Sequence, residues 1–301
     1  MKMLLKGTTE WQLELLKKRK HFFTVHLRGG IGNQLFQYSA GLHFALTHGI
    51  SVRFHDAGID HGVSIQSLGL PGKYISDGVF QKVGKKLIRD SKFFSRGRLV
   101  EFNDIGFDQN LEQLLPYTKI RGYFQTSYYY RELSRRGITL EINEKQLSHP
   151  VREFGKLMPQ DSTLIHIRLG DYLKGRDTLG NLTQSYFKNA VMKFSNSEHN
   201  YILTDGDHQE ISKFLAEWDI PFTIVPRFPN VSDFEYLHLF GRATSIIGSN
   251  SSFSWWGGQF ARAEASVYLP KPWFKANQLE SQLGKNFYDK KWETIHSNWI
   301  Q

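Results

Sequence analysis

The fold is decided by one stretch near the N-terminus, Phe22-Phe23-Thr24-Val25-His26-Leu27-Arg28-Gly29-Gly30-Ile31-Gly32-Asn33. Its first seven residues are largely aromatic, β-branched or aliphatic and predict a buried strand, and the glycines after them predict a tight turn. From Gln34 to His48 apolar residues recur at helical spacing, Gly49 ends that pattern, and residues 50–54 begin another strand. This strand–turn–helix–strand order predicts parallel α/β packing.

The second half of the chain repeats the alternation of short apolar runs with helical patterns. The predicted strands are 162–167, 201–203, 221–225, 245–247 and 266–269. The predicted helices are 183–194, 208–218, 232–242 and 252–262. A polar run over residues 134–150 separates the halves, which predicts two α/β domains with a ligand cleft between them at the carboxyl ends of their strands.

Composition restricts the classes of protein and partner. The 301 residues are 40% hydrophobic, which allows a real core and excludes disorder as a description of the whole chain. The net charge of +9 favours anionic partners, but the basic residues are spread out, which argues against nucleic acid. The chain contains no cysteine, so disulfides, thiolate metal sites and a cysteine nucleophile are excluded.

The N-terminal segment carries no apolar core of a signal peptide, and no stretch of 18 apolar residues occurs. Together with the missing cysteines, this predicts a cytoplasmic protein. Residues 1–20 can form a short helix that ends in the basic run Lys17-Lys18-Arg19-Lys20. That helix is either a solvated surface helix or a peripheral contact with the anionic inner face of the cytoplasmic membrane.

Two glycine- and serine-rich turns follow predicted strands and precede predicted helices. In the first, Gly29 to Gly32, a ligand phosphate can approach the backbone and the N–H groups of the helix start. The alternative is a plain tight turn, with Asn33 and Gln34 as capping residues. The second is Asn250-Ser251-Ser252-Phe253-Ser254-Trp255-Trp256-Gly257-Gly258. It suits phosphate oxygens, or it is an ordinary serine cap followed by core tryptophans.

Two further segments place charged side chains at strand ends. In His166-Ile167-Arg168-Leu169-Gly170-Asp171, an arginine can neutralise a pyrophosphate, with Asp171 orienting it. The alternative is a buried Arg–Asp pair beside a core histidine. In Asp205-Gly206-Asp207, the two carboxylates suit either a divalent metal or a turn.

Four motifs in order resemble the α-1,2-fucosyltransferase family, glycosyltransferase family 11, of bacterial type. They are Gly29-Gly30-Ile31-Gly32-Asn33-Gln34-Leu35-Phe36-Gln37-Tyr38, Gly122-Tyr123-Phe124-Gln125, His166-Ile167-Arg168-Leu169-Gly170-Asp171-Tyr172 and Ser251-Ser252-Phe253-Ser254-Trp255-Trp256-Gly257. The resemblance implies a GT-B fold, in which two Rossmann-like domains face a central cleft. It also implies inverting transfer of L-fucose from GDP-β-L-fucose, the donor substrate, to the 2-hydroxyl of a galactose-terminated glycan. Such an enzyme would serve O-antigen, capsule or other surface glycan synthesis.

The resemblance places an acceptor-side domain at 1–148, a donor domain at 149–285, and a segment at 286–301 that can cross back to the first domain. It implies that no metal or cofactor is needed, which argues against the metal interpretation of Asp205 and Asp207. The catalytic residues implied are Arg168, which neutralises the leaving GDP, together with Asn33 and Asp171. The donor-binding residues expected are Gly29, Gly30, Gly32, Asn33, His166, Arg168, Asp205, Glu235, Ser251, Ser252 and Phe253.

Two positions depart from the family pattern. Leu169 stands where the family has a second arginine, and Tyr236 stands where an acidic residue reads guanine. Glu235 or Asp233 can substitute for that acidic residue. The general base is open among His26, Asp171 and Asp177, since an acceptor hydroxyl must lose its proton.

Three alternatives to the fucosyltransferase remain open. The first is a GT-B transferase that uses another nucleotide sugar, and the second is a non-catalytic module that binds sugars or nucleotides. The third is a metal-dependent transferase.

Overall fold

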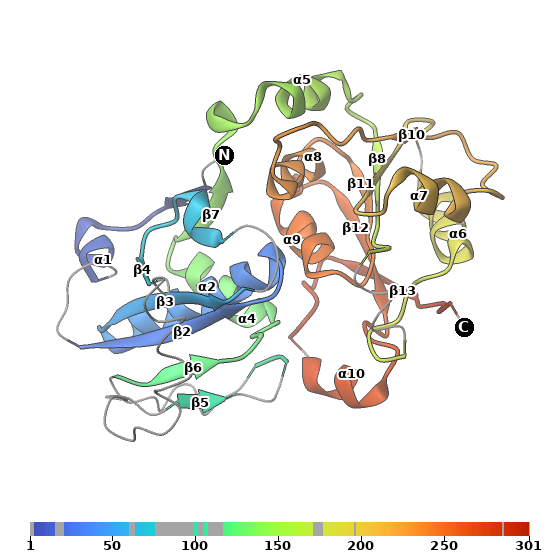
Figure 1. The fold of residues 1–301 in the computed structure, drawn as a ribbon. Helices are drawn as coiled ribbons and strands as arrows, with labels where there is room; N and C mark the ends of the chain where they lie inside the picture. Colours follow the sequence, from blue (N-terminus) through green and yellow to red (C-terminus); the bar gives the residue numbers. More distant parts are fainter. Residues whose placement is uncertain are drawn as a thin grey trace, which may run out of the picture. The chain divides into compact units, whose positions relative to one another are not determined.

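The structure is a computed structural model that describes residues 3–15, 21–59, 64–75, 99–101, 105–107, 117–170, 177–195, 197–284 and 286–300. The chain divides into two compact units (Figure 1). The N-terminal unit comprises Lys2–Glu141 and Leu283–Phe287. The C-terminal unit comprises Ile142–Gln282 and Tyr288–Gln301.

The division between the units falls at Glu141 instead of at residue 148, because Ser148 is bonded to the C-terminal unit. The N–H of Ser148 donates to Glu235 at 2.6 Å, so this residue is held by the C-terminal unit. The segment expected at 286–301 is also divided, because only Leu283–Phe287 joins the N-terminal unit. There the carbonyl of Asn286 accepts the N–H of Ser127 at 2.8 Å.

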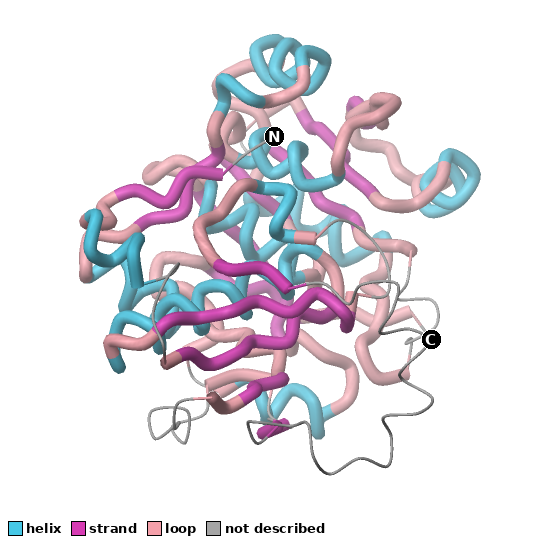
Figure 2. Tube along the Cα trace, turned by 60° about the vertical axis from the view of Figure 1, so that its left-hand side comes forward, coloured by secondary structure: helices cyan, strands magenta, loops and turns pink. Residues whose placement is uncertain are grey.

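The N-terminal unit is built on a parallel sheet whose described strands run in the order β4-β3-β2-β6-β5. Its elements are β1 (Met3–Lys6), α1 (Glu10–Leu15), β2 (Phe22–Arg28), α2 (Ile31–His48), β3 (Ser51–Gly58), η1 (Ile65–Leu68), β4 (Lys73–Ile75), β5 (Leu99–Glu101), β6 (Lys119–Arg121), α4 (Ser127–Arg135) and β7 (Thr139–Ile142). The predicted strand, turn and helix from Phe22 to His48 are confirmed. Figure 2 shows the strands of this sheet lying side by side.

The extreme N-terminus differs from the predicted helix. Met3–Lys6 form β1, which pairs with β7, and among the described residues of this segment Glu10–Leu15 are helical. The basic run from Lys17 lies outside the described residues. In the part of the chain that the structure describes, no helix is both long and apolar enough to cross a membrane.

The C-terminal unit has a parallel sheet in the order β10-β9-β8-β11-β12-β13 across its described strands. Its elements are η4 (Glu144–Gln146), α5 (His149–Leu157), β8 (Thr163–Ile167), α6 (Gln184–Phe194), β9 (Asn200–Thr204), α7 (His208–Phe214), β10 (Thr223–Ile224), η6 (Asp233–Tyr236), α8 (Leu237–Phe240), β11 (Ser245–Ile247), α9 (Ser252–Phe260), β12 (Ser266–Lys271), α10 (Asn277–Leu283) and β13 (Glu293–His296).

The strand order of this second sheet determines where a ligand can bind. Numbered along the chain from β8, the order is 3-2-1-4-5-6, the order of a doubly wound Rossmann sheet. The connections leave in opposite directions on either side of β8 and β11, which makes this pair the topological switch point. Ligands of such sheets bind outside the carboxyl ends of the strands at that point.

The largest fully buried side chains in both units are aromatic. Trp255, Trp256 and Trp273 in the C-terminal unit and Tyr38 and Phe54 in the N-terminal unit are at most 1% exposed. Full burial of a large apolar side chain contributes about 1.5–3 kcal/mol, so these residues stabilise the sheets that carry the site. The alternative role proposed for the tryptophans of the last motif, as core residues, therefore describes them correctly.

Candidate functional site

The switch point is formed by two loops that are bonded to each other. One follows β8 and begins at Arg168, and the other follows β11 and contains Ser249. The Ser249 hydroxyl donates to the carbonyl of His166 at 2.8 Å and accepts the N–H of Arg168 at 2.9 Å. Ser249 is 1% exposed, so these two hydrogen bonds link the loops inside the protein. The sequence analysis did not single out Ser249, although it directly precedes the last motif.

Arg168 is oriented by Asp205 at the end of the neighbouring strand β9. The guanidinium Nη1 lies 2.9 Å from Asp205 Oδ2, and the two side chains are 25% and 17% exposed. Asp205 also accepts the N–H groups of Leu169 at 2.8 Å and Gly170 at 3.3 Å. The expected Arg–Asp pair is therefore made with Asp205, while Asp171 lies outside the described residues.

Space around the Asp205 carboxylate is tight. A Cβ on Gly170 would lie 2.6 Å from Asp205 Oδ2, so this position excludes a side chain. Leu169, which stands in place of the family's second arginine, is 7% exposed and packs in a hydrophobic cluster with Ile165, Tyr186 and Ile211. Position 169 therefore faces the core, whereas Arg168 keeps a quarter of its side chain in solvent.

His166 is a buried, neutral ring at the same strand end. It is 3% exposed, its Nδ1 lies 2.6 Å from Ser254 Oγ, and its ring packs against Phe253 at 5.1 Å between centroids. Burial lowers the pKa of His166 to about 3; Asp205 acts against this shift, and Arg168 and Arg227 add to it. At neutral pH this imidazole carries no charge, and its low pKa makes it a weak proton acceptor, so its part here is to position neighbours. Ser254 and Arg227 are site residues that sequence reasoning missed.

The start of α9 lies beside these groups because β11 pairs with β8 in register, Ile247 opposite Ile165. Ser251 caps this nine-residue helix by accepting the N–H of Phe253 at 3.3 Å. Its backbone N–H groups therefore point to the carboxyl side of the sheet, where a helix N-terminus favours an anion. The serine cap and the phosphate site, weighed as alternatives for Ser251, Ser252 and Phe253, are thus compatible.

Asp207 has a structural role next to the site. It caps α7 by accepting the N–H groups of Gln209 and Glu210, both at 2.8 Å, and Glu210 completes a capping box. Asp205 meanwhile pairs with Arg168. Among the described residues, no group of three or more His, Asp or Glu side chains is arranged to hold a metal ion.

Glu235 and Tyr236 anchor the backbone around η6. Glu235 is 5% exposed and accepts the N–H of Ser148. The Tyr236 hydroxyl accepts the N–H of Phe228 at 2.8 Å and donates to the carbonyl of Pro226 at 3.1 Å. Glu235 thus already binds a backbone donor in this structure, and its role in reading guanine stays a prediction.

In the N-terminal unit, the first motif forms the turn between β2 and α2. Gly29 has φ of +71°, a left-handed conformation that favours glycine, and a Cβ there would lie 2.6 Å from Asn33 Nδ2. Gly30 is the N-cap of α2 with no side-chain cap, and no heavy atom of the described residues beyond its chain neighbours lies within 4 Å of where its Cβ would be. The backbone at Gly30 is exposed and is therefore placed as a ligand-facing helix start requires, whereas Gly32 is buried within α2.

The amide side chains of this motif brace the neighbouring loops. Asn33 Oδ1 accepts the Nε2 donor of Gln125 at 2.8 Å, so the first motif meets the Gly122–Gln125 segment. Gln37 accepts the N–H of Arg28 at 3.0 Å and donates to the carbonyl of Gly122 at 3.1 Å. Neither Gln34 nor Asn33 caps α2 through its side chain, so the capping alternative is wrong.

Of the three candidates for the general base, the structure describes two. His26, at the carboxyl end of β2, packs against His55 of β3 with ring centroids 4.8 Å apart. Arg28, two residues further, stacks on Tyr123 at 4.5 Å. Asp177 lies in an exposed turn of the C-terminal unit. The structure does not favour one of these groups as the base.

Comparison with known proteins gives a relative by sequence and a fold by structure. No protein-family model matches the chain. The chain is 25% identical over 297 residues to an α-1,2-colitosyltransferase from Escherichia coli, and the match covers 85% of this chain and 94% of that protein. The fold is similar to that of a family 9 glycosyl transferase from Veillonella parvula DSM 2008, with a TM-score of 0.50, 10% identity, and coverage of 93% of this chain and 88% of that one.

The fucosyltransferase NodZ from Bradyrhizobium is also similar, with a TM-score of 0.47, 12% identity, and coverage of 81% of this chain and 94% of that one. The predicted fold class, α/β of GT-B type with two Rossmann-like domains, is confirmed. The cleft between the domains stays a prediction. The chain is therefore a GT-B protein whose sequence is similar to that of a sugar transferase.

Proposed function

We propose that this chain is an inverting glycosyltransferase that moves L-fucose from GDP-β-L-fucose to the 2-hydroxyl of a galactose in a surface glycan. One observation carries the proposal: Arg168, fixed by Asp205, lies beside the N-terminus of α9 at the switch point of a Rossmann sheet. A cation and a helix N-terminus at one strand end form a site for a diphosphate. The α-1,2-colitosyltransferase relative supports sugar transfer as the reaction.

The chemistry follows from the charge that develops on the nucleotide as its bond to the sugar breaks. The acceptor oxygen forms the new bond to the anomeric carbon from the face opposite the nucleotide, the bond to the diphosphate breaks, and the configuration inverts. GDP then carries the electron pair of the broken bond, so negative charge grows on its β-phosphate. Arg168 and the N–H groups at the start of α9 stabilise that charge, and Asp205 keeps the guanidinium in place before the reaction.

The proton of the acceptor hydroxyl needs an acceptor other than His166. The pKa of His166, lowered to about 3 by burial, makes its imidazole too weak a base. His26 lies near the carboxyl end of β2, two residues before Arg28, on the unit expected to hold the acceptor. We keep His26, Asp171 and Asp177 as candidates for this proton.

A second donor is supported by the sequence relative. Colitose is L-fucose without the 3-hydroxyl, and the relative transfers colitose in α-1,2 linkage. The two donors share the nucleotide-leaving chemistry and differ in one hydroxyl of the transferred sugar. A donor site that hydrogen-bonds the 3-hydroxyl would reject the deoxy sugar strongly, whereas an apolar site would not.

The test is incubation of the full chain with each nucleotide sugar and a panel of β-galactosides, followed by mass and linkage analysis. GDP-fucose and GDP-colitose are compared with UDP-galactose as a control donor. We expect fucosyl transfer to the 2-hydroxyl of galactose, undiminished by EDTA because the reaction is proposed to need no metal. Transfer only from another nucleotide sugar would replace the proposed donor. Absence of transfer with retained nucleotide binding would favour the non-catalytic module.

The proposal extends to where in the cell the reaction takes place. A surface-glycan precursor is assembled at the cytoplasmic side of the membrane, so we propose a cytoplasmic enzyme with peripheral contact to anionic lipid through its basic N-terminal segment. Vesicle flotation with and without phosphatidylglycerol tests this contact. Binding that requires the anionic lipid and disappears in high salt supports it, and absence of binding removes it.

A further inference from the structure

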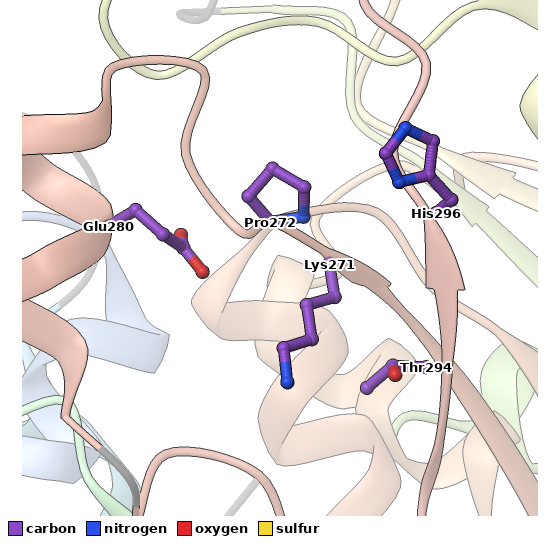
Figure 3. Close-up of a pocket in the computed structure, with 5 residues that line it drawn as sticks. All are labelled: Lys271, Pro272, Glu280, Thr294 and His296. Atoms are coloured by element: carbon purple, nitrogen blue, oxygen red, sulfur yellow. The ribbon is translucent and has the colours of Figure 1, made fainter.

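A pocket of about 510 Å³ lies at the carboxyl edge of the C-terminal sheet, outside every motif described above (Figure 3). Lys271 and Pro272 at the end of β12 form its floor, Thr294 and His296 of β13 form one side, and Glu280 of α10 forms the other. β12 is the neighbour of β11, so the pocket opens on the same edge of the sheet as the switch point. Its volume lies within the range of about 300–1,000 Å³ usual for small-ligand sites.

The floor of the pocket is held by backbone bonds. Lys271 and His296 are register partners at the last positions of two parallel strands, so their side chains leave the sheet at the same end. The N–H of Ser297 donates to the carbonyl of Lys271 at 3.0 Å, and its hydroxyl donates to the carbonyl of Pro272. A pocket fixed in this way loses little conformational freedom when a ligand binds.

The opposite wall is fixed by Glu280. Its Oε2 accepts the N–H groups of Trp273 at 2.7 Å and Phe274 at 2.9 Å, and Trp273 is itself 1% exposed. These bonds tie α10 to the turn that follows β12. Both engage Oε2, and a carboxylate has acceptor positions on each of its oxygens. Figure 3 shows the carboxylate pointing from α10 toward Pro272.

The chemistry of the lining indicates the class of ligand. Lys271 donates, Glu280 accepts, and Thr294 and His296 can do either, while Pro272 adds an apolar surface. The formal charges of Lys271 and Glu280 cancel, so the lining has no net attraction for a phosphate, and the carboxylate repels one. A neutral sugar ring matches this set, because its hydroxyls both donate and accept and its C–H face is apolar.

We propose that this pocket binds a neutral sugar residue of a glycan, at a site separate from the nucleotide-sugar site. The proposal goes beyond the proposed function, because it needs a sugar ligand but no particular donor. It gives the C-terminal unit two ligand positions on one sheet edge, one for a diphosphate at β8 and β11 and one for a sugar at β12 and β13. Such a second position would select glycans by a residue that does not react.

The experiment measures binding directly in the full chain. The imidazole resonances of His296 in ¹⁵N-labelled protein are followed while methyl β-galactoside, methyl β-glucoside or methyl α-mannoside is added, with and without GDP. We expect at least one glycoside to shift His296 at millimolar concentration whether or not GDP is present. The variants Lys271→Met and Thr294→Val each remove one hydrogen-bonding group and should weaken that binding about 10-fold.

The controls distinguish loss of sugar binding in the pocket from misfolding and from loss of transferase activity. Lys291→Met removes an exposed lysine outside the pocket and should leave binding unchanged. Wild-type binding by both Lys271→Met and Thr294→Val would overturn the proposal, as would no shift of His296 with any glycoside. A shift with inorganic pyrophosphate alone would make the pocket an anion site and also overturn it. Sugar binding without any transferase activity would leave the pocket standing and refute the proposed function instead.

Discussion

Replacement of Arg168 by alanine should lower kcat/KM for sugar transfer at least ~100-fold and leave the fold intact. The first effect is the usual size for loss of one preorganised group that stabilises transition-state charge, and it corresponds to about 2.7 kcal/mol. The second follows from the geometry. The Arg168–Asp205 pair is only 25% and 17% exposed, so its loss should cost between the about 0.2–1 kcal/mol of a surface pair and the about 3–5 kcal/mol of a fully buried one. Asp205 also keeps the N–H groups of Leu169 and Gly170 as partners.

The assay is initial-rate kinetics with GDP-fucose and the best β-galactoside, together with the free energy of unfolding in urea. The matched control is Arg152→Ala in α5, which removes an arginine 35% exposed and 3.6 Å from Glu153 but away from the switch point. The control should keep wild-type kcat/KM. A folded Arg168→Ala enzyme that turns over at the wild-type rate would refute the role of the guanidinium in stabilising the leaving group.

The remaining predictions concern the turns and the buried groups that hold the site. Gly30→Ala should keep wild-type stability, since φ is −67° and no atom of the described residues lies within 4 Å of the new Cβ. It should nevertheless lower activity if a ligand approaches this backbone. Gly29→Ala, at φ of +71°, should cost about 1–2 kcal/mol of stability. Equal activity of Gly30→Ala and wild type would remove that contact. Ser249→Ala leaves two buried backbone groups without their partner and should lower the free energy of unfolding by about 1–3 kcal/mol, read by urea denaturation. Because the pKa of His166 is about 3 when folded and near 6.5 when unfolded, the unfolded state binds the extra proton. Protonation of His166 in the unfolded state should therefore lower stability by roughly 1 kcal/mol per unit as the pH drops from 6 to 4. His43, whose pKa burial lowers to about 4, adds to the same fall, so His166→Gln should make the slope shallower without removing it; an unchanged slope would contradict the burial of a neutral ring.

Much of the fold follows from patterns in the sequence. The strand–turn–helix unit at Phe22 to His48 and the alternation after residue 162 predict parallel sheets, because apolar periodicity reports which face is buried. β1 and β13 were missed, since four-residue strands at the edge of a sheet have little periodicity. The structure divides the chain before residue 148, and the bond of Ser148 to the C-terminal unit joins residues about ninety positions apart, which a local pattern does not report.

The site residues at the strand ends were predictable from the sequence, but the side chains that bind them were not. His166, Arg168 and Ser251 lie at the switch point because parallel strands place their carboxyl ends on one edge. The structure pairs Arg168 with Asp205, 37 residues along the chain in the loop after β9, which the sequence did not predict as its partner. Asp171, the partner expected from the sequence, lies outside the described residues and stays a prediction. Sequence periodicity carries no information on which of two carboxylates a guanidinium reaches, since that depends on the register of β8 against β9.

The most direct test of the account is the linkage of the sugar that the full chain transfers from GDP-fucose to a β-galactoside, with Arg168→Ala run in parallel. The account predicts an α-1,2-linked fucosyl galactoside from the wild-type chain and at least ~100-fold less of it from the variant. A different linkage or a different donor would contradict the proposed specificity. Equal product from the two proteins would contradict the central claim, that the arginine fixed by Asp205 at the switch point neutralises the departing nucleotide.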